Sequence, residues 1–199
     1  MIPFVKMHGC GNDFLLVREA DLLEGDPAAD RWRVDPQHLA RRGCDRHFGV
    51  GADGLLVYGP RPARDGLPRL RMRYWNADGS PAAMCGNGAR CVVRLAVLRH
   101  EAEPPLVLET DAGPRPARVV WRDGRIAAVA IDMGPPTWDP PSVPVRAGSP
   151  LVASPLAVGA LEVAVTALSM GNPHAVVVLP DRAALTALAL GETGRALCE

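Results

Sequence analysis

The segment that most constrains the fold runs from residue 84 to residue 98 and reads MCGNGARCVVRLAVL. Its apolar spacing predicts a helix over residues 89–100. Apolar side chains at Val92, Val93 and 95–98 cover most of the circumference of this helix. A helix that is apolar on nearly all sides is buried on nearly all sides. The rest of the chain is therefore expected to surround it.

The start of this helix points to a ligand site. Gly86 and Gly88 permit unusual backbone angles and close approach by a ligand, and the free N–H groups of a helix start attract an anion such as a carboxylate. Cys85 stands just upstream, where the positive end of the helix dipole favours its thiolate form. A cysteine beside a buried helix is commonly a small apolar core residue, so catalysis and packing both stay open for Cys85. Cys91, inside the helix, is better explained as core.

Strands separated by turns account for most of the remaining chain. Alternation of apolar and charged residues predicts a half-buried strand over residues 70–74, followed by a turn over 76–79. An Asp-Gly pair at 123–124 predicts a hairpin between strands 118–121 and 126–131. Further elements are expected as strands at 163–168 and 175–179 and as helices at 35–42 and 181–190. This pattern predicts an α+β protein with helices packed on an antiparallel sheet.

Composition and charge exclude several classes of protein. The 199-residue chain has a formal net charge of zero, which gives no electrostatic footprint for nucleic acid or for an anionic membrane surface. No apolar run approaches the ~20 residues of a membrane span, and the first residues lack a signal peptide, so a cytoplasmic protein is expected. The five cysteines are odd in number and the chain is not a short secreted one, which argues against a disulfide framework. They form no C-x-x-C pair, which argues against a structural metal site.

Four turns rich in glycine or asparagine lie beside predicted strands and the central helix. Each such turn, taken alone, is commonly no more than a turn. Together they could converge on one polar ligand, because an asparagine amide offers donors and acceptors without net charge. Such a lining suits a ligand that carries an ammonium and a carboxylate group. The four turns occupy residues 11–14, 49–54, 86–88 and 171–174.

Four longer segments give the chain a resemblance to the diaminopimelate epimerase family. They are HGCGNDF at 8–14, GVGADGLL at 49–56, NADGSPAAMCGNGARC at 76–91 and MGNPHAVVV at 170–178. The resemblance implies two similar halves, each with a sheet wrapped around a central helix, and a substrate between them. It implies an isomerase of lysine and cell-wall precursor synthesis that interconverts LL- and meso-diaminopimelate without cofactor or metal. Two thiols would exchange a proton with Cα, one as base and one as acid.

The resemblance also assigns roles to individual residues. Cys85 matches one of the two catalytic thiols. Gly86 and Asn87 match the turn that binds the reacting α-carboxylate. The substrate-binding asparagines of the family match Asn12, Asn76 and Asn172. His174 matches a histidine near the catalytic site; the alternative is a structural histidine that caps the Asn-Pro turn.

The chain departs from the family pattern in its second half. The motif with the second catalytic cysteine is absent, because Gly191-Glu192-Thr193 and Cys198 have the wrong spacing and no glycine follows Cys198. We therefore expect a complete first unit over 1–131 with Cys85, an incomplete second unit over 132–199, and a truncated, inactive chain. A non-catalytic remnant that keeps half a binding site, as an interaction module, is the alternative. For the full-length protein we expect a homodimer with a small-molecule substrate and neither nucleic acid nor membrane as partner.

Overall fold

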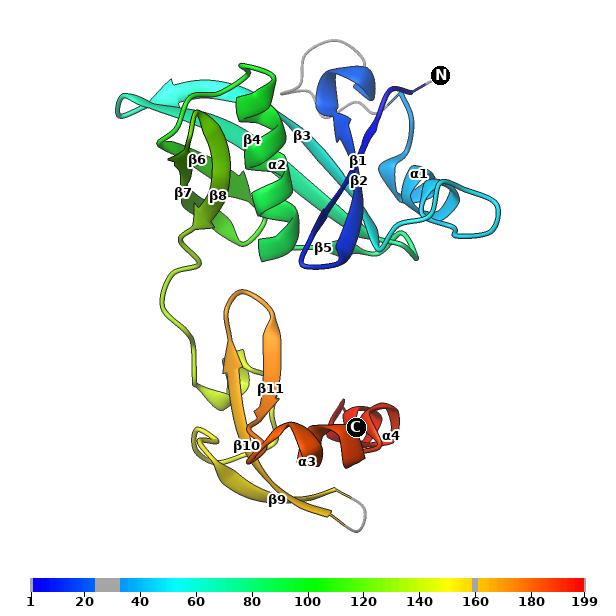
Figure 1. Cartoon of the computed structure of the whole chain (residues 1–199), viewed down its shortest axis with the longest axis vertical. Helices are drawn as coiled ribbons and strands as arrows, with labels where there is room; N and C mark the ends of the chain where they lie inside the picture. The colour runs from blue at the N-terminus through cyan, green and yellow to red at the C-terminus, as the bar shows by residue number, and fades with distance from the viewer. Residues whose placement is uncertain (1, 24–32, 159–160, 199) are drawn as a thin grey trace. The chain divides into compact units, whose positions relative to one another are not determined.

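The computed structural model describes residues 2–23, 33–158 and 161–198. It divides the chain into two units, residues 1–133 and residues 134–199, whereas the predicted boundary follows residue 131. Each unit contains its own sheet (Figure 1). The α+β class predicted for the chain is confirmed. No helix among the described residues is long and apolar enough to cross a membrane.

Among the described residues, the first unit contains an eight-stranded sheet, two α-helices and one short 3-10 helix. The strands are β1 (Val5–Gly9), β2 (Asn12–Arg18), β3 (Gly54–Arg64), β4 (Leu67–Asn76), β5 (Pro81–Ala82), β6 (Leu106–Thr110), β7 (Gly113–Arg122) and β8 (Arg125–Ile131). The helical segments are η1 (Glu19–Asp21), α1 (Pro36–Gly43) and α2 (Gly86–Leu98). The predicted strand at 70–74 lies within β4, and the predicted Asp-Gly hairpin joins β7 to β8.

The sheet has the order β1-β2-β3-β4-β6-β7-β8, with β5 paired to β4. The predicted antiparallel pairing holds at most junctions, but β2 pairs with β3 and β4 pairs with β6 in parallel. Parallel neighbours need a crossover connection. The crossover between β2 and β3 contains α1, and the crossover between β4 and β6 contains α2. The central helix is therefore itself one of the connections that make the sheet mixed.

The sheet curls around α2, as the sequence predicted. The helix contacts β2 and β3 and also the two outermost strands, β1 and β8, so the sheet wraps it from both sides (Figure 1). Most of its residues are buried; Gly86, Asn87, Arg90 and Arg94 are half-buried, and Leu98 at its end is exposed. Burial on nearly all sides explains why the helix is apolar on nearly all sides.

Strands β2 and β3 are buried on both faces. Phe14 and Leu16 of β2 pack toward α2, whereas Leu15 and Val17 pack into a second core beside α1. The second core is closed by Ala40 of α1 and Trp75 of β4, among others. Strands covered on both faces read as continuous apolar runs rather than as alternating ones, which matches FLLV and LLVY in this sequence.

The central helix begins earlier and ends earlier than predicted. It starts at Gly86, so Gly86, Asn87 and Gly88 form its first turn instead of preceding it. At its other end, His100 adopts a positive φ of 56°. Its N–H donates to the carbonyl of Val97, and the N–H of Glu101 donates to that of Ala96. These two bonds form the C-terminal cap that stops the helix at Leu98.

The second unit is a small three-stranded sheet with short helices. Its elements are η3 (Pro140–Ser142), β9 (Ser154–Val158), β10 (Leu161–Ser169), β11 (Pro173–Val177), α3 (Arg182–Ala187) and α4 (Leu190–Cys198). The predicted strand at 163–168 lies within β10, and the one predicted at 175–179 begins and ends two residues earlier. The single helix predicted at 181–190 is two helices, because Leu188 takes an extended conformation after α3. Nothing in α3 is buried, so packing does not hold the two pieces in one line.

Candidate active site

A tight turn sets the position of Asn12. Gly9 of β1 pairs with Asn12 of β2, which leaves Cys10 and Gly11 as a two-residue turn with φ values of 57° and 88°. Two positive φ values are the signature of the type I′ hairpin turn. Alternate side chains of a strand share a face, so Asn12 projects on the same side as Phe14, toward α2.

Cys85 occupies the N-cap position of α2, directly before its first helical residue. It has extended angles, φ −144° and ψ 113°, and its side chain makes no capping hydrogen bond. The thiol is half-buried, and Sγ donates to Oδ1 of Asn12 across 3.7 Å. Because an α-helix leaves its first N–H groups without intrahelical acceptors, the thiol stands beside free backbone donors. The arrangement can hold a carboxylate next to a sulfur.

Asn87 joins the same cluster from the first turn of α2. Its Nδ2 donates to Oδ1 of Asn12 across 3.4 Å, and Arg90 donates to its Oδ1. The backbones also lie close, since a Cβ on Gly9 would come within 3.0 Å of the Asn87 carbonyl oxygen. The structure thus brings together three predicted site residues, Cys85, Asn87 and Asn12, from segments that are distant in sequence.

A charged network holds Asn12 from its other side. Nδ2 of Asn12 donates to Oδ2 of Asp53 across 2.7 Å. Arg46 donates to Oδ1 of Asp53 across 2.8 Å and to Oδ1 of Asp13 across 2.7 Å. Hydrogen bonds from Arg46 and Lys6 hold the pKa of the Asp13 carboxyl well below its usual range, against the opposing effect of burial. The pKa of Asp53 is also lowered, first by the hydrogen bond from Asn12 and then by the backbone N–H of Asp13.

Asp53 and Arg90 are therefore part of the site, although the sequence did not single out either of them. Each stands inside a segment that carries the family resemblance, Asp53 in GVGADGLL and Arg90 in CGNGARC. The signal in the sequence that could have identified Asp53 and Arg90 as site residues was their charge. A carboxylate only accepts hydrogen bonds and a guanidinium only donates them.

Asn76 lies at the end of β4, opposite Gly54 of β3. It shares a face with Tyr74, which packs in the core around α2. Burial raises the pKa of Tyr74 to about 12, and a negative charge on Cys85 acts in the same direction. The Asn76 amide donates to Oγ of Ser80 across 3.0 Å. Asn76 thus faces the helix side of the sheet, with its side chain engaged in the turn that follows.

Asn172 and His174 belong to the second unit. They stand at the β10–β11 hairpin, where Gly171 has a φ of 102°. Nε2 of His174 lies 3.2 Å from Oδ1 of Asn172, and both side chains are exposed. This contact is what a histidine that orders the Asn-Pro turn would make, so the structural interpretation of His174 stays open beside the functional one.

Gly86 and Gly88 have different surroundings, which corrects the interpretation of the pair. A Cβ on Gly86 would find its nearest neighbour, Sδ of Met133, at 3.7 Å, whereas a Cβ on Gly88 would meet the side chain of Leu56 at 3.0 Å. Gly88 is buried and lies inside the helix. Close packing on β3, rather than an unusual backbone angle or a ligand, explains the glycine at position 88.

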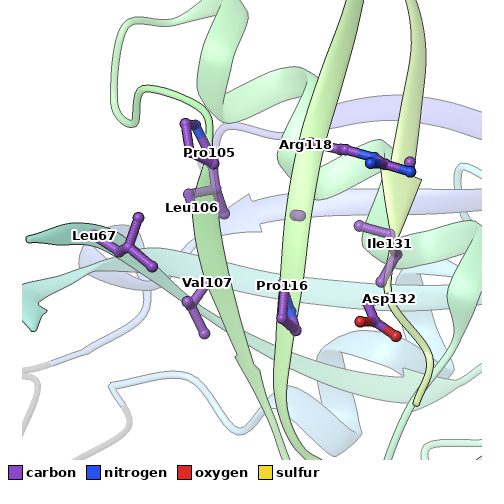
Figure 2. Close-up of a pocket in the computed structure, with 10 residues that line it drawn as sticks. Leu67, Pro105, Leu106, Val107, Pro116, Arg118, Ile131 and Asp132 are labelled. Carbon is purple, nitrogen blue, oxygen red and sulfur yellow. The ribbon is translucent and has the colours of Figure 1, made fainter. Parts of the chain in front are cut away.

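Cavities of the first unit lie both beside the cluster of Asn12, Cys85 and Asn87 and away from it. A cavity of about 480 Å³ over β6, β7 and β8 is lined mainly by apolar side chains such as Leu67, Val107 and Pro116 (Figure 2). Its lining, among the described residues, includes no thiol and no predicted site residue. Two other hollows, of about 420 and 460 Å³, flank the cluster. One is lined by Lys6, His8, Asp13 and Arg46, the other by His8, Cys10, Arg90 and Arg94, among others. Charged side chains stand at both hollows, although Asn12, Cys85 and Asn87 are not among the residues that line them.

Solved structures of two other proteins share this fold. A probable proline racemase from Agrobacterium radiobacter K84 aligns with a TM-score of 0.60 over 98% of this chain and 53% of that chain. A hydroxyproline epimerase from Agrobacterium vitis aligns with a TM-score of 0.59 over 96% of this chain and 52% of that chain. Their sequences are 19% and 17% identical to this one. At that identity the likeness establishes the fold alone.

Sequence comparison identifies the family. A family model described as diaminopimelate epimerase matches residues 4–138. A diaminopimelate epimerase from Moorella thermoacetica is 43% identical over 89% of this chain and 60% of that protein. One from Desulforudis audaxviator is 45% identical over 88% of this chain and 59% of that protein. The chain spans about 60% of the length of these curated relatives, and it belongs to the diaminopimelate epimerase family.

Proposed function

We propose that this chain provides the first half of the active site of a diaminopimelate epimerase, with Cys85 as one of its two thiols. The observation that carries the proposal is the position of Cys85 at the N-terminus of α2, hydrogen-bonded to Asn12 and beside free backbone N–H groups. Catalysis is favoured over packing for this cysteine, because its sulfur has a polar neighbour and is only partly buried.

The backbone N–H groups of Gly86 and Asn87 would bind the α-carboxylate of the substrate. Negative charge that spreads into this carboxylate when Cα loses its proton is stabilised there, because the donors and the helix dipole are already oriented. One sulfur, as thiolate, takes the Cα proton, and a thiol on the opposite face returns a proton to Cα. The carbon is inverted and no other bond changes. Asn12, Asn76 and Asn172 would hold the substrate, and His174 would support the site.

The second thiol is expected from a motif that these 199 residues lack, and Cys10, exposed in the turn between β1 and β2, does not match that motif. Cys44 and Cys91 are buried, and burial raises the pKa of both. The side chain of Cys198 lies outside the described residues. We therefore propose that these 199 residues alone do not turn over diaminopimelate. For the full-length protein we propose a cytoplasmic homodimer of lysine biosynthesis that uses neither cofactor nor metal.

The test is proton exchange and inversion at Cα of diaminopimelate in D₂O, followed by NMR. We expect no exchange with the purified chain, and exchange with a chimera that adds the remaining carboxyl-terminal length of the Moorella thermoacetica relative. Cys85→Ser should lower the rate of the chimera by at least ~10²–10⁴-fold, the usual contribution of a positioned acid or base. Cys91→Ala, in the core of α2, is the matched control and should retain activity.

Two outcomes would contradict the proposal. Full activity of the Cys85→Ser chimera would remove Cys85 from the reaction. An inactive chimera, together with calorimetric binding of diaminopimelate to the 199-residue chain, would favour the non-catalytic half-site module.

A further inference from the structure

The orientation of the Asn12 amide is determined by a neighbour that can only accept. Nδ2 of Asn12 lies 2.7 Å from Oδ2 of Asp53. An ionised carboxylate has no proton to give, so the NH₂ group of Asn12 must face Asp53. The carbonyl oxygen Oδ1 is thereby turned the other way, to 3.7 Å from Sγ of Cys85 and 3.4 Å from Nδ2 of Asn87.

A neighbour that can only donate determines the Asn87 amide. Arg90 donates to Oδ1 of Asn87, and a guanidinium has no acceptor atom. The NH₂ group of Asn87 must then face Asn12, and it meets Oδ1 of that residue. Asp53 and Arg90, two residues of opposite charge, thus both require that Asn12 present a hydrogen-bond acceptor to the cluster.

We propose that Asp53 is a positioning residue that, through Asn12, turns a carbonyl oxygen toward Cys85 and so favours the protonated thiol. A carbonyl oxygen accepts from S–H but repels S⁻, whereas an amide NH₂ in its place would donate to S⁻. The positive end of α2 acts in the opposite sense. Through the orientation of Asn12, Asp53 therefore opposes the effect of the helix dipole on Cys85. It favours the protonated thiol, which is the form that can give a proton to carbon.

Hydrogen bonds to both of its carboxylate oxygens hold Asp53 in the position that orients Asn12. Oδ1 accepts from Arg46 across 2.8 Å, and Oδ2 accepts from the backbone N–H of Asp13 across 3.0 Å. These donors and Asn12 favour the ionised carboxylate. The orientation of Asn12 consequently persists over the pH range in which thiols ionise. The catalytic meaning of the inference rests on the proposed function, but the hydrogen-bond polarity does not.

The first test measures the alkylation of Cys85 by iodoacetamide between pH 6 and pH 10, using peptide mass spectrometry on the full chain. Asp53→Asn supplies an NH₂ group that lets Asn12 reverse and donate to the sulfur. We expect the pH of half-maximal alkylation to fall, with alkylation at pH 7 about tenfold faster. Asp13→Asn is the matched control, since it removes the same charge from the same network without contacting the Asn12 amide. It should accelerate alkylation by about threefold or less.

A double-mutant cycle isolates the route through Asn12. In an Asn12→Leu background, Asp53→Asn should have no larger effect than Asp13→Asn. Equal effects of Asp53→Asn and Asp13→Asn in the parent chain, or no effect of Asp53→Asn, would overturn the proposal.

A spectroscopic measurement keeps the proposal testable if Asp53→Asn fails to fold. The infrared S–H stretch of Cys85 is obtained as the difference between the parent chain and Cys85→Ser. We expect the lowered frequency of a thiol that donates to a carbonyl oxygen, and the frequency of a free thiol would overturn the proposal. Neither readout requires turnover, so failure of the epimerase proposal and failure of this one are distinguishable.

Discussion

Burial separates the cysteines of the first unit into two pairs. Cys44 and Cys91 are only 2% and 3% exposed, whereas Cys10 is exposed and Cys85 is half-buried. Removal from water disfavours a thiolate. It raises the pKa of Cys44 to about 11 and also raises that of Cys91. The two thiols that remain in contact with solvent flank the Asn12–Asn87 cluster.

The alkylation pattern should follow this division. At pH 8, iodoacetamide should modify Cys85 and Cys10 and leave Cys44 and Cys91 unmodified. A thiol with a pKa about 11 is ionised in only about one molecule in a thousand at that pH, and both buried sulfurs are also shielded from the reagent. Peptide mass spectrometry provides the measurement, and labelling in urea is the control in which all four should react. Modification of Cys91 as fast as Cys85 would refute the division.

The sequence revealed part of this site and could not reveal the rest. Motifs at 8–14 and 84–91 predicted that Asn12, Cys85 and Asn87 share one place, and the structure brings both Cys85 and Asn87 within hydrogen-bond distance of Asn12. Their catalytic roles stay predictions. The parts played by Asp53 and Arg90 depend on which atoms of Asn12 and Asn87 they meet. Sequence spacing carries no information on the orientation of an amide group, so the roles of Asp53 and Arg90 follow only from the structure.

At the scale of elements, the first turn of α2 illustrates a local rule overridden by packing. The apolar spacing predicted a helix that begins at residue 89, after Gly86-Asn87-Gly88, and glycine costs ~1 kcal/mol relative to alanine inside a helix. The helix includes all three residues. Gly88 lies against Leu56, which is fully buried in β3, and a Cβ at position 88 would meet the methyl groups of that side chain at 3.0 Å. Tertiary contact therefore outweighs helix propensity at this position.

Substitution by alanine should separate the two glycines. Gly88→Ala should destabilise the first unit by ~1–3 kcal/mol, because the new methyl group overpacks against Leu56. Gly86→Ala, where the nearest atoms lie at 3.7 Å or more, should be neutral or stabilising by up to ~1 kcal/mol. The free energy of unfolding from urea titrations provides the measurement. In a Leu56→Ala background, Gly88→Ala should cost less, and an unchanged cost there would rule out Leu56 as the cause.

Periodicity predicted elements better than it predicted their connections. The hairpin of β7 and β8 followed from alternation and Asp-Gly, and its turn has the expected positive φ values, 51° at Asp123 and 70° at Gly124. The parallel pairs β2–β3 and β4–β6 were not foreseen. Pairing direction depends on where a crossover returns the chain, which no local pattern states. The break at Leu188, which divides the predicted 181–190 helix into α3 and α4, was not foreseen either, and no residue of α3 is buried.

At the scale of the whole molecule, the two units differ in how much apolar surface they bury. The first has two cores, one on each face of β2 and β3. The buried residues of the core cluster described for the second unit are Val158, Val163 and Val165, with Val177 and Leu197 packed against them. Within its three-stranded sheet, β9 and β11 are both edge strands. A small sheet with a small core has little hydrophobic stabilisation to offset the loss of chain entropy.

Hydrogen exchange should therefore distinguish the units. Amides of β10 should exchange through an opening reaction of low free energy, whereas amides of β2, β3 and α2 should exchange only through unfolding of the whole first unit. We expect low concentrations of urea to accelerate exchange in β10 and β11 while the β2–β3 pair stays protected. Mass spectrometry of peptides after timed exchange provides the measurement, with Leu56→Ala as a variant that weakens only the first core, by ~2–5 kcal/mol. That variant should lower protection in β2 and β3 and leave β10 unchanged. The same urea dependence in both sets of strands, or loss of protection in β10 with Leu56→Ala, would show that the chain unfolds as one cooperative unit.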